Sequence, residues 1–219
     1  MTMIMFVKSY HRIQQALQWW SFRQSLKLSV EADKIREELL QELFTVRRNL
    51  ELSAIDNQDV SIEKSQSYVK QIDHLHRSLA RLSDRLFPSY LQDNFPLAIE
   101  NLLEPWIVSY PHLDFHMSMP FSWRYEPAEH SLIVLNALEE LLIITLPELL
   151  SPIVVNISLQ QRQNLAQLIV TMTYSDLSML ISYSNLRELD YLCESFRALT
   201  AGKLFYRINN LLVAYYFYW

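Results

Sequence analysis

The chain has 219 residues, of which half are hydrophobic and a fifth are charged. This composition indicates a globular protein with one large domain or two small ones, and excludes a disordered chain. The net charge of −5 argues against nucleic acid as a partner, because a phosphate backbone is bound by a basic face. A single cysteine, Cys193, excludes an intrachain disulfide and is typical of a reducing compartment.

No stretch of the sequence is expected to enter a membrane. The segment MTMIMFVK is too short an apolar run for a signal peptide, and the apolar region 132–157 is interrupted by three glutamates. We therefore expect a cytoplasmic protein.

Glycine is nearly absent, since Gly202 is the only one in the chain. Loops that bind nucleotide phosphates need residues without Cβ, both for positive φ and for close backbone approach. The sequence therefore excludes a P-loop, a dinucleotide fingerprint and a glycine-rich ATP lid, and we expect no cofactor.

The first elements in chain order are helices. Apolar residues at helical spacing predict one or two helices over residues 3–30, in which Trp19 and Trp20 are expected to serve core or dimer packing; the alternative is a docking surface for a partner. Apolar residues three or four apart then predict a long helix over 32–52 and a second one over 63–87, joined by a polar turn at 53–62.

These two helices carry a continuous apolar seam, which predicts an antiparallel hairpin. The seam consists of Leu39, Leu43, Val46 and Leu50 on the first helix and Ile72, Leu75, Leu79 and Leu82 on the second. One hairpin alone leaves half of each seam in water, so we predict a homodimer that forms a four-helix bundle. His74 and His76 lie off the seam, and their spacing on a helix prevents them from chelating one metal ion.

The remaining pattern predicts an α/β sandwich, a mixed sheet with helices on one face, and hence an α+β protein. The expected helices are 96–106, 128–146 and 186–199, and the expected strands are 113–119, 153–159, 165–174, 203–208 and 211–218. The last two strands form a hairpin across Asn209 and Asn210, whose side chains tolerate the left-handed conformation.

Three segments resemble bacterial sensor histidine kinases of the subfamily with a His-Asp phosphoacceptor box. LLQELF followed by VRRNLEL is similar to the first dimerisation helix, LFPSYLQDNFPLAIENLLEPW to the second helix and its linker, and FRALTAGKLFYRI to the last helix and strand of the ATPase-like domain. The resemblance spans about residues 32–219. It implies an N-terminal helical extension at 1–30, a dimerisation hairpin at 31–88 and an ATPase-like domain at 96–219.

The resemblance fails at the positions that carry the chemistry. The phosphoacceptor position is occupied by Arg36, whose guanidinium cannot take a phosphoryl group as a neutral imidazole does, and the adjacent acid position by Glu37. Where the family holds Mg²⁺ with an asparagine four residues after a glutamate, this chain has Glu139 or Glu140 followed by Ile143 or Ile144, and we expect no metal site. Asp176 is a remnant of the adenine-reading aspartate, without the glycines that should follow it.

These losses together predict a pseudokinase: a dimeric, non-catalytic adaptor in two-component signalling that binds a receiver domain or another kinase. Arg36 would face the acidic pocket of a receiver; its alternative is a solvated arginine that pairs with Glu37 or Glu38. Two other functions stay open. One is a phosphotransferase that uses His74 or His76 without binding ATP, and the other is a structural subunit of a larger assembly.

Overall fold

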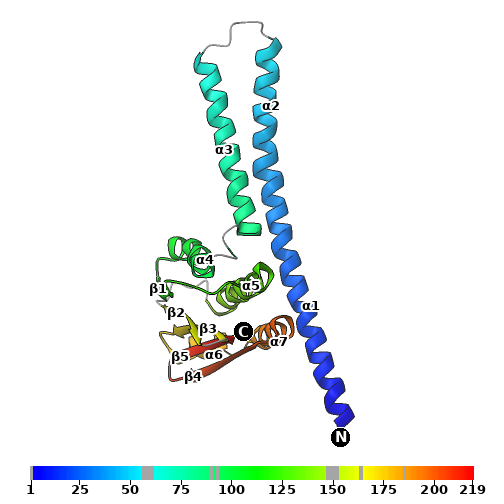
Figure 1. Cartoon of the computed structure of the whole chain (residues 1–219), viewed down its shortest axis with the longest axis vertical. Coiled ribbons are helices and arrows are strands. Elements are labelled where there is room, and N and C mark those ends of the chain that lie inside the picture. The colour runs from blue at the N-terminus through cyan, green and yellow to red at the C-terminus, as the bar shows by residue number, and fades with distance from the viewer. Residues whose placement is uncertain are drawn as a thin grey trace. The chain divides into compact units, whose positions relative to one another are not determined.

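The computed structural model describes residues 2–55, 62–88, 91, 94–146, 153–162, 165–184 and 186–219. They form two compact units, shown in Figure 1, which we describe separately. One unit comprises Phe22–Ser89, and the other comprises Met1–Ser21 together with Tyr90–Trp219. The first is a helical hairpin and the second combines helices with a five-stranded mixed sheet, so the α+β class is confirmed.

The hairpin unit contains four helical elements, of which the first three follow one another without a break. These are the end of α1 (Thr2–Lys34), the π-helical segment η1 (Ile35–Leu39), α2 (Leu40–Ile55) and α3 (Ile62–Leu86). A single helix covers the region where one or two were expected, and α3 lies within one residue of its predicted bounds. The predicted turn at 53–62 falls largely on residues 56–61, which lie outside the described residues.

The apolar seam divides into two stripes, each with a spacing of seven residues. Leu39 and Val46 are buried, and Leu75 and Leu82 are half-buried, so this stripe lies within the hairpin. The other stripe keeps 43% to 49% of its side-chain surface exposed. It consists of Leu43, Leu50, Ile72 and Leu79. The hairpin by itself therefore buries only half of the seam.

The second unit contains the sheet and the helices that cover it. Its helices are α4 (Phe95–Ser109), α5 (Ala128–Thr145), α6 (Leu177–Ser184) and α7 (Arg187–Thr200). Its strands are β1 (Leu113–Ser118), β2 (Ile153–Arg162), β3 (Leu165–Thr173), β4 (Lys203–Asn209) and β5 (Leu212–Tyr218). All of the predicted helices and strands of this region are present, whereas α6 was not expected.

The sheet has the strand order β1-β2-β3-β5-β4, in which only β1 and β2 run parallel. Side chains alternate between its faces, and the inward face includes Val155, Val170 and Phe217, all fully buried. Figure 1 shows α4, α5 and α7 on this side of the sheet, as a sandwich requires. Asn94 begins α4, since its side chain accepts a hydrogen bond from the amide of Leu97 at 3.1 Å.

The first part of α1 packs on α7 in this unit. Ala16 and Ser195 are both fully buried where the two helices meet, and the Ser195 hydroxyl donates a hydrogen bond of 2.8 Å to the Ala16 carbonyl. Trp19 lies against Tyr191 with ring centroids 6.1 Å apart. Trp19 and Trp20 pack against the hydrophobic core, which confirms core packing for this pair.

Gly202 lies between α7 and β4, but it is not the left-handed residue that ends the helix. That residue is Ala201, with φ of 54°. Gly202 is required instead by close approach, because a Cβ there would lie 2.1 Å from the carbonyl oxygen of Tyr218. In the terminal hairpin, Asn210 has φ of 54° as predicted, while Asn209 is the last residue of β4.

Candidate functional site

The predicted phosphoacceptor position lies in η1, where the amide of Leu40 bonds the carbonyl of Ile35, five residues back. Such a turn holds one residue more than an α-helical turn and often marks a functional segment. The guanidinium of Arg36 pairs with Asp33 at 2.9 Å, and both side chains stay more than half exposed. The expected acidic partners were Glu37 or Glu38. Asp33 takes this place because it lies three residues away on the same helix face.

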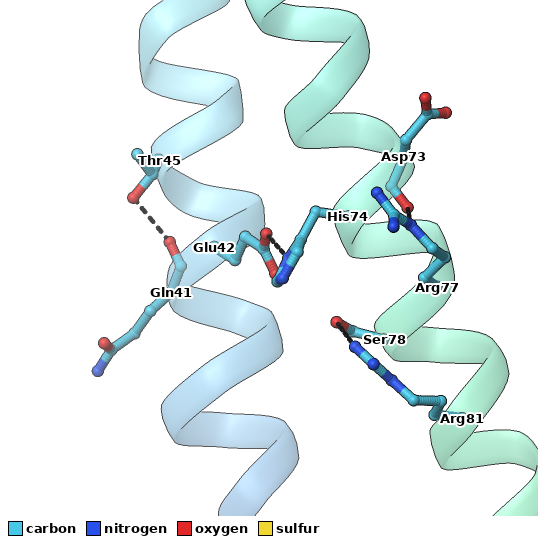
Figure 2. Close-up of polar contacts among 8 residues, drawn as sticks. All are labelled: Gln41, Glu42, Thr45, Asp73, His74, Arg77, Ser78 and Arg81. Carbon is cyan, nitrogen blue, oxygen red and sulfur yellow. Dashed lines mark hydrogen bonds and ion pairs between the residues drawn. The ribbon is translucent and has the colours of Figure 1, made fainter.

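A histidine–carboxylate pair joins the two helices of the hairpin (Figure 2). Nδ1 of His74 on α3 lies 2.5 Å from Oε1 of Glu42 on α2. An ionised carboxylate can only accept a hydrogen bond, so Nδ1 must carry the proton. In the neutral ring this leaves the lone pair on Nε2, and the His74 side chain is 60% exposed. In that neutral tautomer the pair presents a nucleophilic ring nitrogen to solvent.

The side chains around His74 supply a cation on the same side of α3. Residues 74, 78 and 81 follow one another at helical spacing, and Nη2 of Arg81 lies 3.3 Å from Oγ of Ser78. Arg77 points elsewhere, because its Nε donates to the backbone carbonyl of Asp73 at 3.2 Å. His76 is exposed. Of the two histidines, His74 is the one that a carboxylate orients.

In the other unit, Asp176 directly precedes α6 and is its N-cap residue. Its Oδ1 accepts hydrogen bonds from the Ser178 hydroxyl at 2.5 Å and from the Met179 amide at 2.9 Å. These bonds, that of Ser178 first, lower the pKa of the Asp176 carboxyl. The carboxylate is thus engaged by its own helix, which is the arrangement of a helix cap.

The candidates on α5 form two pairs four residues apart, Glu139 with Ile143 on the more exposed face and Glu140 with Ile144 toward the core. Glu140 is buried, with 4% of its surface exposed, and Glu139 is half-buried. Ile143 is 45% exposed, whereas Ile144 packs against the core. Neither isoleucine has an oxygen that could ligate a hard cation.

An aromatic pair fills the space where β3 ends beside α6. The Tyr174 ring is buried and stacks on Tyr183, with ring planes 3° apart and centroids 6.5 Å apart. Its hydroxyl donates a hydrogen bond of 3.0 Å to the carbonyl of Thr145 at the end of α5. Burial raises the pKa values of Tyr174 and Tyr215, so both phenols stay protonated at neutral pH.

The residues that the sequence resemblance assigns to a nucleotide site differ in the ligands they offer. Asp176 caps a helix, and Ile143 and Ile144 have hydrocarbon side chains. Among the residues that the structure describes, no three His, Cys, Asp or Glu side chains cluster as a metal site would require. Within the same residues, no helix is both long enough and apolar enough to cross a bilayer.

The structure thus brings together one pair that the sequence did not predict, Glu42 with His74. Among the described residues, no hydrogen bond or ion pair joins Arg36 or Glu37 to His74. Glu42 gave no signal in the sequence, because it lies 32 residues from His74 and resembles any other solvated flank. The cap at Asp176 had a signal, an aspartate directly before the apolar positions of a short helix.

Comparisons with known proteins give structural likenesses only. No protein-family model matches the chain, and no curated protein is detectably similar to it in sequence. The catalytic domain of histidine kinase ThkA is similar over 57% of this chain and 91% of its own length, with 10% identity and a TM-score of 0.45. A histidine kinase from Burkholderia phymatum STM815 is similar over 83% of this chain and 97% of its own, with 10% identity and a TM-score of 0.45.

A third solved structure is histidine kinase ThkA in complex with the response regulator protein TrrA. It is similar over 95% of this chain and 65% of its own, with 13% identity and a TM-score of 0.44. Likenesses at this level establish neither a family nor a function for the chain, so its function is argued below from its own residues.

Proposed function

We propose that the chain is a non-catalytic, dimeric signalling adaptor of two-component type, a pseudokinase that binds a receiver domain or another kinase. The engagement of the Asp176 carboxylate carries the proposal. Its Oδ1 accepts bonds from the Ser178 hydroxyl and the Met179 amide, and its Oδ2 accepts one from the Ser175 hydroxyl. The carboxylate thus caps its own helix and has fewer acceptor sites left for a base.

The test is calorimetric titration of the full chain with ATP or ADP in the presence of magnesium. We expect no heat of binding at cellular nucleotide concentrations, because Ile143 and Ile144 offer no oxygen ligand and the sequence has a single glycine from which to build a phosphate-binding loop. The variant Asp176→Ala serves as the control, since releasing a helix cap should not create a nucleotide site. Micromolar affinity in the wild-type chain would overturn the proposal.

The exposed stripe of the hairpin supports dimerisation. Leu43, Leu50, Ile72 and Leu79 are half exposed at regular spacing, and burying a leucine stabilises by about 1.5 to 3 kcal/mol. A second hairpin would cover this stripe with an identical one, which is the arrangement of a four-helix bundle.

Arg36 is the residue that we assign to a receiver partner. Its pair with Asp33 is exposed, and exposed pairs contribute at most about 1 kcal/mol, so the guanidinium can exchange Asp33 for a carboxylate on a partner. A guanidinium binds carboxylate or phosphoryl oxygens in two parallel hydrogen bonds but accepts no phosphoryl group. The receiver would therefore be held and not phosphorylated.

This assignment is tested by charge reversal in a complex with a receiver. Arg36→Glu should weaken binding by several kcal/mol if the contact is central. Arg48→Glu provides the matched control, with the same charge change at an exposed position of α2. Equal affinities of wild type and Arg36→Glu would leave Arg36 as an ordinary surface residue.

The Glu42–His74 pair favours a second function, phosphotransfer without ATP. In this reaction the Nε2 lone pair of His74 attacks the phosphorus of an aspartyl phosphate on a receiver. The N–P bond forms as the P–O bond to the aspartyl carboxylate breaks, and the aspartate leaves as a carboxylate. Glu42 holds the ring in the reactive tautomer and offsets the positive charge that develops on it.

Incubation with a receiver that carries labelled phosphate separates the two functions. Phosphotransfer predicts acid-labile label on the chain, lost in His74→Gln and kept in His76→Gln, which is the matched control. Glu42→Gln should slow transfer, because an amide does not fix the same tautomer. Absence of label from the wild-type chain would exclude phosphotransfer and keep the adaptor function. Label retained in His74→Gln would exclude His74 as the phosphoacceptor.

A further inference from the structure

The outward face of the sheet carries an aromatic and basic patch at β4 and β5, which we call the β4 patch: Lys203, Phe205, Arg207, Tyr216 and Tyr218. Lys203 pairs in register with Tyr218, and Phe205 with Tyr216, so these side chains share one face. Leu204 and Phe217, on the opposite face, are buried in the core. Phe205 keeps 36% of its surface exposed.

The charges of the β4 patch are both positive. Lys203 and Arg207 are exposed and lie on either side of Phe205 along the strand. In the described part of the chain, neither forms an ion pair with a carboxylate. The whole chain has a net charge of −5, so the patch is a local basic surface on an acidic protein. Its complement is an acidic ligand.

The rings of the β4 patch stack on one another. Phe205 lies 5.2 Å from Tyr216 and 5.9 Å from Tyr218, with ring planes 20° and 12° apart. The guanidinium of Arg207 lies 5.8 Å from the Phe205 centroid and 5.9 Å from that of Tyr216. Each of these rings thus already has an aromatic or guanidinium neighbour, whereas nucleobases bind by stacking on free faces. This arrangement favours a protein ligand over a nucleic acid.

The position of β4 favours an extended ligand. β4 is the last strand in the sheet order, so its outer backbone groups have no strand partner among the described residues. Such an edge can accept an added strand. A second copy of β4 is disfavoured there, because it would bring Lys203 and Arg207 against identical cations, and like charges on neighbouring strands are destabilising.

We propose that the β4 patch binds an extended acidic segment of a protein partner, which pairs with β4 as an added strand. Side chains of such a strand alternate between faces, so every second residue meets the patch. The matching pattern is acid, any residue, aromatic, any residue, acid, in which the acids face Lys203 and Arg207 and the aromatic residue meets Phe205. This inference goes beyond the proposed adaptor role and does not depend on nucleotide, receiver or dimer.

The probe is a labelled synthetic peptide of roughly ten residues, long enough to span a strand, that contains this pattern. The comparison peptide has the same composition, but its acids are moved by one position, so that they lie on the opposite face of the strand from the aromatic residue. Binding of each to the full chain is followed by fluorescence anisotropy. We expect the patterned peptide to bind at least roughly tenfold tighter than its comparison, because only in the patterned peptide do the acids and the aromatic residue share one face of the strand.

Variants of the full chain locate the site. Arg207→Glu and Lys203→Glu should each weaken binding of the patterned peptide roughly tenfold or more, while Lys70→Glu, the same charge change on α3, should leave it unchanged. Phe205→Ser should also weaken binding. Thermal unfolding of each variant shows whether the fold is kept. We expect that it is, because these side chains are exposed.

Results of three kinds would overturn the proposal. The first is no binding of the patterned peptide at millimolar concentration. The second is equal binding of the two peptides, or equal binding by wild type and Arg207→Glu with the fold intact. The third is tighter binding of a single-stranded oligonucleotide of about ten nucleotides than of the patterned peptide, which would make the patch a nucleic-acid surface.

Discussion

Single residues at the end of α7 determine how the chain passes from helix to strand. Ala201 takes the left-handed conformation, and Gly202 lets the backbone pass close to Tyr218. The amide of Gly202 is held by the Thr200 hydroxyl at 3.0 Å, so the glycine cannot easily move away. The two adjacent residues are therefore constrained in different ways, Ala201 by its positive φ and Gly202 by the lack of space for a Cβ.

Gly202→Ala is expected to destabilise the chain by about 1 to 3 kcal/mol, because the new Cβ meets backbone atoms that cannot rotate away. Ala201→Gly should leave the free energy of unfolding unchanged or raise it by up to about 1 kcal/mol, since glycine adopts positive φ without strain. Urea unfolding of both variants measures the difference. Equal stabilities of wild type and Gly202→Ala would contradict the close approach at Tyr218.

Cys193 is the other residue with a distinct prediction. Burial, together with Asp190 and Glu194, raises the pKa of its thiol to about 12. The folded chain therefore holds the proton more tightly than the unfolded chain, which favours the fold below about pH 9, and this contribution is lost as the pH rises towards 12.

Alkylation by iodoacetamide, followed by mass spectrometry, tests this pKa. At pH 8 the folded chain should react on the order of a hundredfold or more slowly than the urea-unfolded chain, since the thiolate is the nucleophile. Its rate should continue to rise above pH 9, where the rate of an ordinary thiol levels off. Similar rates for the folded and unfolded chains at pH 8 would contradict the raised pKa of this half-buried thiol.

Among the elements, α6 has a side-chain cap at its first turn, the carboxylate of Asp176. The Asp176 carboxylate accepts bonds from Ser178 and Met179, and its pKa is lowered by them. The folded state thus favours the ionised form. Its contribution is present above about pH 4 and is lost as the pH falls through the lowered value.

Asp176→Ala should reduce hydrogen-exchange protection in α6 at neutral pH and leave β3 unchanged. Asp176→Asn is the matched control, because asparagine also caps helices but does not titrate, so it should keep the protection at pH 7 and lose the dependence on acid. Unchanged α6 protection in the alanine variant would show that the cap contributes nothing to this helix.

The elements also show which features a sequence pattern can predict. The spacing of apolar residues sufficed for α3, α5, α7 and the strands, because burial on one face imposes a period of 3.6 or 2. It did not predict α6, whose eight residues are too few for a period, or η1, where one extra residue in a turn leaves the apolar spacing unchanged. The Glu42–His74 pair depends on how α2 aligns with α3, and spacing within one helix does not contain that information.

At the scale of the whole molecule, the seam has one stripe inside the hairpin and one on its surface. Substitutions can therefore change the oligomeric state without unfolding the hairpin. The sequence predicts equal roles for all eight seam residues, whereas the structure buries Leu39 and Val46 within the hairpin and leaves Leu43 and Leu79 half exposed. A charge in the first stripe should damage the hairpin itself, and a charge in the second should affect only its association with another hairpin.

We expect the wild-type chain to be a dimer by light scattering, Leu79→Asp to be a folded monomer and Leu39→Asp to lose helix or aggregate. Burying a leucine stabilises by about 1.5 to 3 kcal/mol, and a buried unpaired carboxylate costs more than that gain. Circular dichroism distinguishes the two variants. A wild-type monomer at micromolar concentration would refute the bundle.

The contact between Ala16 and Ser195 has a consequence for biosynthesis. The residues that meet there are 179 positions apart, so α7 is synthesised long after the first part of α1. At about 5 to 20 residues per second, the apolar side of α1 with its two tryptophans waits roughly ten to forty seconds for its partner. During that interval the nascent chain displays a large aromatic surface, and we expect it to be bound by chaperones until translation has passed α7.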